Sequence, residues 1–289
     1  MNILPDLFIQ NIGQLVTVTG ASHKPKTFHG MNEIGIIQDG AVFIKDGNFI
    51  DIGTTKKLKK KYTGANIKII DATGAVVLPG FVDSHTHAVF GGNRTGEFVQ
   101  RIQGKTYLEI LKKGGGIVNT VEQTRKLKFK KLAETSRKYL DTMLLHGTTT
   151  VEIKSGYGLD INTELKILKV IHHLQKTHSM DIVATFLGAH MITPEYKNDT
   201  DTYIKLVCNV LPKVKSYATF CDTFCDVGAF SIKQSERVLK TAKSLGFRLK
   251  IHTNEFEDIG GVSLAIQLEA VSADHLDNIK HRDIVRLKE

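Results

Sequence analysis

The chain has 289 residues and a mass of 32.1 kDa, and 41% of its residues are hydrophobic. This composition suffices for one large domain and a small one, and no apolar run approaches the length of a membrane span. The net charge of +9 accompanies only 7% aromatic residues and no tryptophan, so the lysines indicate a solvated surface and not a nucleic-acid-binding stripe. Three cysteines are too few for a disulfide framework, and the N-terminal sequence lacks the pattern of a secretory signal. We therefore expect a reduced, cytoplasmic protein that binds neither nucleic acid nor membranes.

Residues 1–75 predict a small β-rich domain. Three segments in this region have the composition of strands: QLVTVTG, AVFIKDGNFIDIG and NIKIIDATG. Asp46-Gly47 interrupts the second segment, and an Asp-Gly pair between two β-forming runs is typical of a two-residue hairpin turn.

Residues 76–289 predict alternating strands and helices. Six apolar segments predict strands: VVLPGFVD, TTTVEI, DIVATFLGAH, DTFCDVGAF, FRLKIH and EAVSADH. The clearest helix covers residues 231–246, where Ser231 and Gln234 form a capping box and Gly246 supplies the C-terminal stop. Repeated strand–helix units with continuously apolar strands indicate a parallel sheet, either doubly wound or closed as a (β/α)₈ barrel.

Polar residues distinguish these two folds, because they follow the carboxyl ends of five of the six segments. They are His85 with His87, residues 152–157, His190, His252 with Glu255, and Asp274 with His275. Such clustering is typical of the active-site face of a barrel. A doubly wound sheet should carry a G-x-G-x-x-G phosphate turn after its first strand, and Gly91-Gly92 lacks that spacing. We predict a TIM-type barrel of which about six βα units are present, preceded by the small sheet domain.

A metal site is the chemistry that this pattern favours. His85 and His87 are two residues apart, so in a strand both side chains point to the same side. His252 ends another apolar segment and would reach the same rim of the barrel. Neutral imidazoles suit one divalent ion, zinc or iron. The alternative is that these histidines only pack at strand ends.

Several longer motifs carry a family resemblance. In order they are VVLPGFVDSHTH, FGGNR, QGKTYLEI, GGGI, TTVEIKSGYGLD, LGAH, KIHTNE and SADHL. Together they resemble the amidohydrolase superfamily and, within it, the imidazolonepropionases of histidine degradation. The HTH element is shared across the superfamily, whereas FGGNR, KSGYGLD and LGAH are specific to that one family. The resemblance extends from the N-terminal domain to the last residues.

The resemblance implies how a small-molecule substrate is bound. His85, His87 and His252 would be the metal ligands. Arg94 would bind the substrate carboxylate, because a planar guanidinium can donate two parallel hydrogen bonds. Tyr157 and His190 would contact the substrate ring and its propionate tail. The resemblance leaves open whether the protein forms a homodimer.

The resemblance also implies a reaction. It is the metal-dependent hydrolysis of the cyclic amide C–N bond of 4-imidazolone-5-propanoate to N-formimino-L-glutamate. Metal-activated water would attack the ring carbonyl. Glu255 would bind substrate and transfer protons, and His275 would polarise the carbonyl or stabilise the oxyanion. Asp274 is expected to point away from the site and to have a structural function.

Three departures from the family pattern keep alternatives open. The chain has HTNE, from His252 to Glu255, where HADE is common, and Asp226 where glutamate is usual. It stops at Glu289, before the seventh and eighth strands and the aspartate of the eighth strand that the family uses as a metal ligand and base. We therefore expect the chain alone to be a very poor enzyme. The alternatives are a non-catalytic fragment or one that needs complementation, and another amidohydrolase such as a deaminase or a dihydroorotase-like enzyme.

Overall fold

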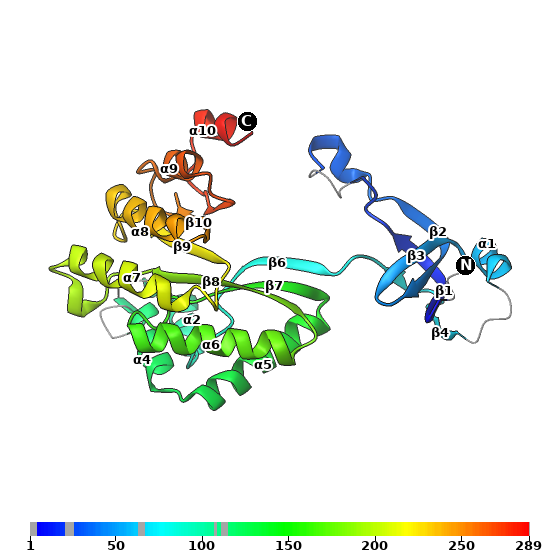
Figure 1. The fold of residues 1–289 in the computed structure, drawn as a ribbon, viewed down its shortest axis with the longest axis horizontal. Coiled ribbons are helices and arrows are strands. Elements are labelled where there is room, and N and C mark those ends of the chain that lie inside the picture. Colours follow the sequence, from blue (N-terminus) through cyan, green and yellow to red (C-terminus); the bar gives the residue numbers. More distant parts are fainter. Residues whose placement is uncertain (1–4, 21–25, 63–66, 107–108, 111–114, 289) are drawn as a thin grey trace. The chain divides into compact units, whose positions relative to one another are not determined.

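The computed structural model describes residues 5–20, 26–62, 67–106, 109–110 and 115–288. The chain divides into two compact units, Met1–Gly80 and Phe81–Glu289 (Figure 1). The boundary falls after residue 80, whereas the sequence predicted it after residue 75. The reason is that Val76 and Val77 pair in parallel with the first strand of the N-terminal sheet. The predicted single strand VVLPGFVD is therefore wrong, because its two halves belong to different sheets.

The N-terminal unit is built on a five-stranded sheet of order β3-β2-β1-β4, with β5 also paired to β1. The strands are β1 Leu7–Val16, β2 Ile36–Lys45, β3 Asn48–Thr54, β4 Lys68–Asp71 and β5 Val76–Val77, with the short helices η1 Phe28–Asn32 and α1 Thr55–Lys61. Asp46 and Gly47 both have positive φ and connect β2 to β3, as the hairpin prediction required. The strand predicted over QLVTVTG was wrong at both ends. The observed β1 begins seven residues earlier, because buried Phe8 stacks on Phe43.

The second unit is built on one parallel sheet. Its strands are β6 Phe81–Thr86, β7 Thr148–Lys154, β8 Asp181–Ala189, β9 Phe220–Cys225, β10 Arg248–Thr253 and β11 Ser272–His275. Each strand pairs in parallel with its neighbour in the sequence, so the spatial order β11-β10-β9-β8-β7-β6 is also the chain order. A doubly wound sheet reverses its order at a switch point. The order observed over the described residues is that of a barrel, and the predicted fold class is confirmed.

Helices connect the strands and cover one face of the sheet. They are α2 Thr95–Ile102, α4 Ile117–Lys126, α5 Phe129–Leu145, α6 Ile161–Thr177, η2 Pro194–Tyr196, α7 Thr200–Val214, α8 Ile232–Ser244, α9 Gly261–Leu268 and α10 His281–Lys288. The predicted capping box at Ser231 and Gln234 begins α8. Over the described part of the chain, no helix is both long enough and apolar enough to cross a membrane.

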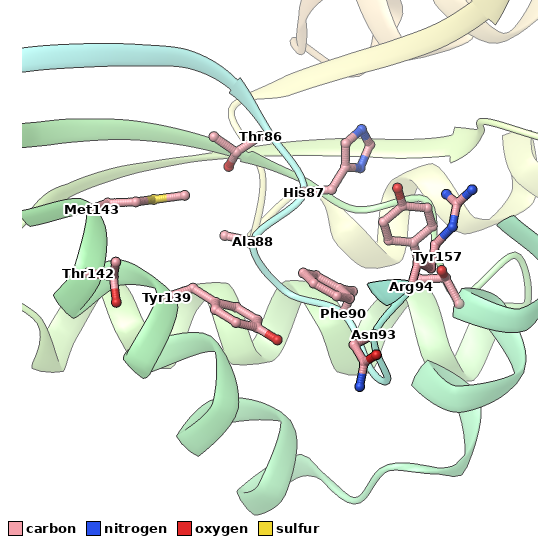
Figure 2. A pocket seen from close by; sticks show the side chains of 11 residues that line it. Thr86, His87, Ala88, Phe90, Asn93, Arg94, Tyr139, Thr142, Met143 and Tyr157 are labelled. Carbon is pink, nitrogen blue, oxygen red and sulfur yellow. The ribbon is translucent and has the colours of Figure 1, made fainter. Parts of the chain in front are cut away.

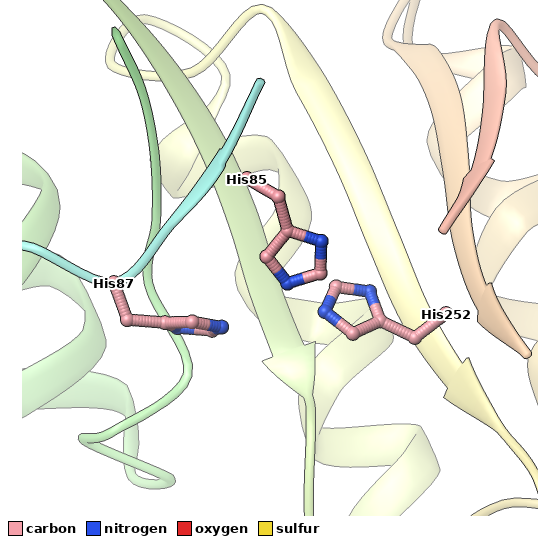
Figure 3. Close-up of side chains that lie close together, drawn as sticks. All are labelled: His85, His87 and His252. Atoms are coloured by element: carbon pink, nitrogen blue, oxygen red, sulfur yellow. The ribbon is translucent and has the colours of Figure 1, made fainter. Parts of the chain in front are cut away.

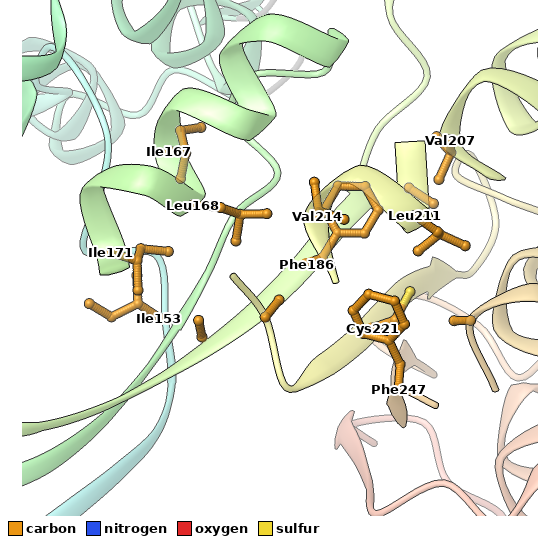
Figure 4. Close-up of a cluster of buried hydrophobic side chains, with 14 of the residues drawn as sticks. Ile153, Ile167, Leu168, Ile171, Phe186, Val207, Leu211, Val214, Cys221 and Phe247 are labelled. Carbon is orange, nitrogen blue, oxygen red and sulfur yellow. The ribbon is translucent and has the colours of Figure 1, made fainter. Parts of the chain in front are cut away.

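The two faces of the sheet differ in chemistry. Alternate residues of each strand pack against the helices, where Ile153 of β7, Phe186 of β8 and Cys221 of β9 meet the apolar sides of α6 and α7 (Figure 4). The residues between them face the other way and include charged groups, such as Glu152 and Lys154 of β7, both buried. The expectation of continuously apolar strands is therefore wrong for β7 and β10, which alternate apolar with charged residues because their second face lines the barrel interior.

The capping box of α8 gives a first prediction. Ser231→Ala removes the side-chain oxygen that accepts from the Gln234 amide, and should lower the free energy of unfolding by about 1 kcal/mol, as for other N-caps. Urea denaturation followed by circular dichroism measures it. Lys233→Ala, an exposed change in the same helical turn, should alter stability much less. Equal effects of the two substitutions would contradict the contribution of the cap.

Candidate active site

Three histidines converge at the carboxyl ends of two strands. His85 lies near the end of β6, His87 directly after it, and His252 near the end of β10. One ring nitrogen from each lies within 4.8 Å of the others (Figure 3). In a flat sheet, β6 and β10 would be about 19 Å apart, at about 4.8 Å per strand. The ring centres of His85 and His252 are 4.5 Å apart, so the sheet must curve as a barrel does.

An oxygen atom lies close to the Nδ1 atom of all three rings. The Nδ1 atom of His85 lies 3.1 Å from Asp274 Oδ2, that of His87 lies 3.1 Å from the Ser155 carbonyl, and that of His252 lies 3.0 Å from Asp222 Oδ2. Carboxylate and carbonyl oxygens can only accept, so we assign the hydrogen of each neutral ring to Nδ1.

The assigned tautomer leaves each Nε2 lone pair for a metal ion. Both ring nitrogens of His252 are buried, and among the described residues neither has a partner in hydrogen-bond geometry. An ion at Nε2 would provide a partner for that atom. The three side chains thus fit zinc or iron, each of which accepts imidazole nitrogen.

Asp274 corrects one of the predictions. It was expected to point away from the site, but its Oδ2 contacts both His85 Nδ1 and Lys154 Nζ. Asp274 is paired in register with His252 across β10 and β11, so it shares the inward face. His275 follows at φ 75°, where the strand ends. This departure from extended geometry lets His275 approach the histidines as well, with its ring centre 5.1 Å from those of His85 and His252.

A buried cluster of charges lies beside the histidines. Lys154 Nζ is 3.0 Å from Glu152 Oε1 and 2.8 Å from both Asp222 Oδ2 and Asp274 Oδ2. Burial alone would lower the pKa of Lys154, but these carboxylates outweigh it and raise the pKa above its ordinary value. Lys250 Nζ, 2.6 Å from Glu152 Oε2, is the second cation of the cluster.

The same interactions act on Asp222. Burial would raise the pKa of Asp222, yet His252 and Lys154 lower it. Sequence reasoning did not single out Lys154 or Asp222. The available signal was the alternation V-E-I-K in β7 and L-K-I-H in β10, where charged residues occupy every second position of an otherwise apolar strand.

All eight residues predicted for the site line one cavity of about 830 Å³. They are His85, His87, Arg94, Tyr157, His190, His252, Glu255 and His275. A neighbouring cavity of about 610 Å³ shares His87, Arg94 and Tyr157 and has an aromatic wall in which Phe90 stacks on Tyr139 (Figure 2). The structure thus places the predicted metal ligands and the predicted carboxylate-binding arginine around one space.

The FGGNR segment positions Arg94. A side chain at Gly91 would lie 2.8 Å from backbone atoms of Gln123 in α4, so only glycine permits this close approach. Gly92 adopts φ 78°, which also favours glycine. Arg94 then precedes α2, and its Nε donates to Glu97 Oε2 at 2.7 Å. The tight loop and this ion pair together hold the guanidinium at the cavity.

Glu164 of α6 organises the segment that contains Tyr157. Its buried carboxylate accepts hydrogen bonds from the amides of Gly156, Gly158 and Leu159. His190 is fixed to the same segment, since its Nδ1 lies 3.0 Å from the Gly156 carbonyl. Burial, followed by the nearby His252, lowers the pKa of His190 to about 4, so its ring is neutral near pH 7.

Glu255 and His275 face each other across the cavity wall, with 3.7 Å between Glu255 Oε2 and His275 Nε2. Burial and then His252 lower the pKa of His275, and Glu255 opposes this effect. Asp226 holds the Glu255 backbone, because its carboxylate accepts from the amides of residues 255, 256 and 257 at 2.8 to 3.1 Å. The substitution of Asp226 for the expected glutamate therefore still provides a carboxylate that anchors this loop.

The parallel order of the strands and the curvature of the sheet are those of a barrel, and comparison of sequences identifies its family. The sequence profile of the amidohydrolase family matches residues 76–287. The chain belongs to the amidohydrolase family.

Closer relatives are imidazolonepropionases. That of Clostridium tetani is 46% identical over 274 residues, which are 94% of this chain and 65% of the relative. That of Alkaliphilus oremlandii is 47% identical over 279 residues, 96% of this chain and 65% of the relative. The chain thus spans slightly less than two thirds of the length of these curated relatives.

Solved structures share the fold at low sequence identity. A 5-methylcytosine deaminase from Klebsiella pneumoniae has a TM-score of 0.60 and 14% identity, covering 93% of this chain and 59% of that chain. A guanine deaminase from C. acetobutylicum has a TM-score of 0.57 and 16% identity, covering 97% and 65%. At this identity the likeness concerns the fold alone.

Asp226 gives the second prediction. Asp226→Asn replaces one accepting oxygen by an amide NH2 group, which can only donate, so at least one of its backbone hydrogen bonds is lost inside a buried site. We expect a loss of about 1 to 3 kcal/mol in the free energy of unfolding and faster proteolysis within residues 255–258. Glu257→Gln removes the same charge from an exposed side chain of this loop and is the matched control. Unchanged protease sensitivity in Asp226→Asn would refute the anchoring function.

Proposed function

We propose that this protein is a metal-dependent hydrolase that opens the cyclic amide ring of 4-imidazolone-5-propanoate and yields N-formimino-L-glutamate. The observation that carries the proposal is that one cavity is lined both by three histidines, with one ring nitrogen of each within 4.8 Å of the others, and by Arg94. The identity to imidazolonepropionases over nearly the whole chain supports the same substrate.

The metal centre is proposed at His85, His87 and His252, with zinc or iron as the ion. A divalent ion held there would make water acidic enough to supply a nucleophile at neutral pH. The chain's own contribution is to fix the three rings in the tautomer that binds metal, through Asp274, the Ser155 carbonyl and Asp222.

Arg94 is proposed to bind the propionate of the substrate. Its guanidinium is always charged and can donate two parallel hydrogen bonds to a carboxylate. Tyr157 and His190 line the same space and would contact the ring, with His190 as a neutral donor or acceptor. A nucleobase has no carboxylate, so this arrangement favours the imidazolone over the substrates of the structurally similar deaminases.

Glu255 and His275 are proposed to move the protons of the reaction. Water adds to the ring carbonyl carbon, its proton passes to Glu255, and Glu255 delivers it to the ring nitrogen as the C–N bond breaks. His275 would donate a hydrogen bond to the carbonyl oxygen as negative charge develops there. The 3.7 Å between the two side chains allows both to reach one substrate ring.

The direct test is an assay of the purified 289-residue chain, loaded with zinc or ferrous iron, on 4-imidazolone-5-propanoate. Because the chain alone is expected to be a very poor enzyme, little N-formimino-L-glutamate should form without a complementing part, and guanine and 5-methylcytosine should remain unchanged. Turnover only after adding the part of the Clostridium tetani relative outside the matched residues would support the same reaction by a two-part enzyme. The proposal would be refuted if neither the chain alone nor the two-part enzyme hydrolysed either class of substrate.

The metal site gives the third prediction. His85→Ala and His252→Ala each remove one of three ligands, so the variants should lose the divalent ion that the wild-type chain binds. Elemental analysis after dialysis against buffered zinc measures the content. His146→Ala, which removes an exposed histidine at the end of α5, should leave it unaltered. Retention of zinc by either ligand variant would remove the proposed site.

Substrate binding and proton transfer give the fourth prediction. The variants are made in the form that is active, either the chain alone or the two-part enzyme. Arg94→Lys loses bidentate geometry and should raise KM about 10- to 100-fold, the range for a hydrogen bond between charged groups. Glu255→Gln keeps the shape but not the base, and should lower kcat about 100-fold or more. Arg282→Lys, at an exposed position of α10, is the control for the first change. Small and equal effects of both changes would contradict the assigned functions.

A further inference from the structure

Lys154 connects two of the proposed metal ligands through one atom. Its side chain is fully buried, and its Nζ lies 2.8 Å from Asp222 Oδ2 and 2.8 Å from Asp274 Oδ2. These same oxygens lie 3.0 Å from His252 Nδ1 and 3.1 Å from His85 Nδ1. One ammonium group therefore holds two carboxylates, and each carboxylate holds one imidazole ring.

The forked arrangement determines how the rings are presented. Each of these two oxygens has an ion-pair contact with Lys154 and a contact with one histidine ring. A carboxylate with one partner can rotate about its terminal bond, which is broad in energy, whereas one with two partners in fixed directions cannot. Fixing the oxygen fixes the Nδ1–H donor that faces it, and hence the Nε2 lone pair on the opposite side of the ring.

We propose that Lys154 is a positioning residue, which sets the orientation and the Nδ1–H tautomer of His85 and His252 through Asp274 and Asp222. The proposal rests on the metal site of the proposed function. Lys154 does not touch substrate or metal itself. Lys154 is the last residue of β7 and lies on neither of the strands, β6 and β10, that carry His85 and His252. Its contacts to Asp222 of β9 and Asp274 of β11 therefore bridge the barrel interior.

Lys250 offers a matched comparison. It is also a nearly buried lysine on an inward position of the sheet, and its Nζ pairs with Glu152 Oε2 at 2.6 Å. Glu152 in turn contacts Lys154 and Thr185 but none of the three ligand histidines. Replacing Lys250 removes the same charge from the same cluster without breaking the fork.

The fifth prediction uses Lys154→Met and Lys250→Met in the metal-free chain, with nitrogen-15 in the histidine rings. Two-dimensional NMR spectra of the ring nitrogens report the tautomer. We expect the Nδ1–H form of His85 and His252 in the wild type and in Lys250→Met, and a mixture with the Nε2–H form in Lys154→Met. Identical ring spectra in all three proteins would overturn the proposal. The measurement needs neither metal nor activity, so its result is separate from that of the proposed function.

A cobalt titration adds an independent readout. Lys154→Met should bind one Co²⁺ about 10- to 100-fold more weakly, the usual effect of losing a partner of metal ligands, with an altered visible spectrum. Unchanged or tighter binding, or a second bound ion, would overturn the proposal and assign Lys154 a purely electrostatic function. Should Lys154→Met fail to fold, Lys154→Gln is measured in its place. Its amide nitrogen has two N–H donors, but the side chain is shorter than that of lysine and uncharged, so it cannot hold both carboxylates as the ammonium group does. At least one of the two rings should then lose the Nδ1–H tautomer.

Discussion

The alternation of apolar and charged residues along the parallel strands is the constraint on which the rest of the structure depends. One face of each strand packs against α6, α7 and their neighbours, and the other carries groups that water would normally solvate. Burial of a charge is costly unless it is paired. Glu152, Lys154, Asp222 and Lys250 satisfy that requirement by pairing with one another, which permits a polar interior.

This polar interior supports the candidate site directly above it. The carboxylates that balance Lys154 are the same groups that face the Nδ1 atoms of His85 and His252. The ion pairs that balance the buried charges and the contacts that face the proposed metal ligands thus belong to one network. A substitution inside the barrel should therefore affect the metal site even where it touches no ligand.

The residues proposed to contact substrate are held in place by a different kind of interaction. Arg94, Tyr157 and Glu255 follow strand ends, in segments with little regular structure of their own. Each segment is tied by a carboxylate that accepts backbone or guanidinium hydrogens: Glu97, Glu164 and Asp226, respectively. A buried carboxylate that accepts two or three amides can fix a loop as firmly as a strand ladder would.

The sequence by itself determined the class of fold, and its strand ends predicted a site at His85, His87 and His252, because these patterns are local properties of the chain. The family resemblance added Arg94, Tyr157, His190, Glu255 and His275, and all eight residues line one cavity. Sequence reasoning misassigned Asp274, since nothing local revealed that His275 leaves the extended conformation. It included Lys154 among the polar residues 152–157 without giving it an individual function, and it did not select Asp222. Tertiary structure alone decided their function: curvature of the sheet brings β6, β7, β9, β10 and β11 around one interior, and only there do distant charges become partners.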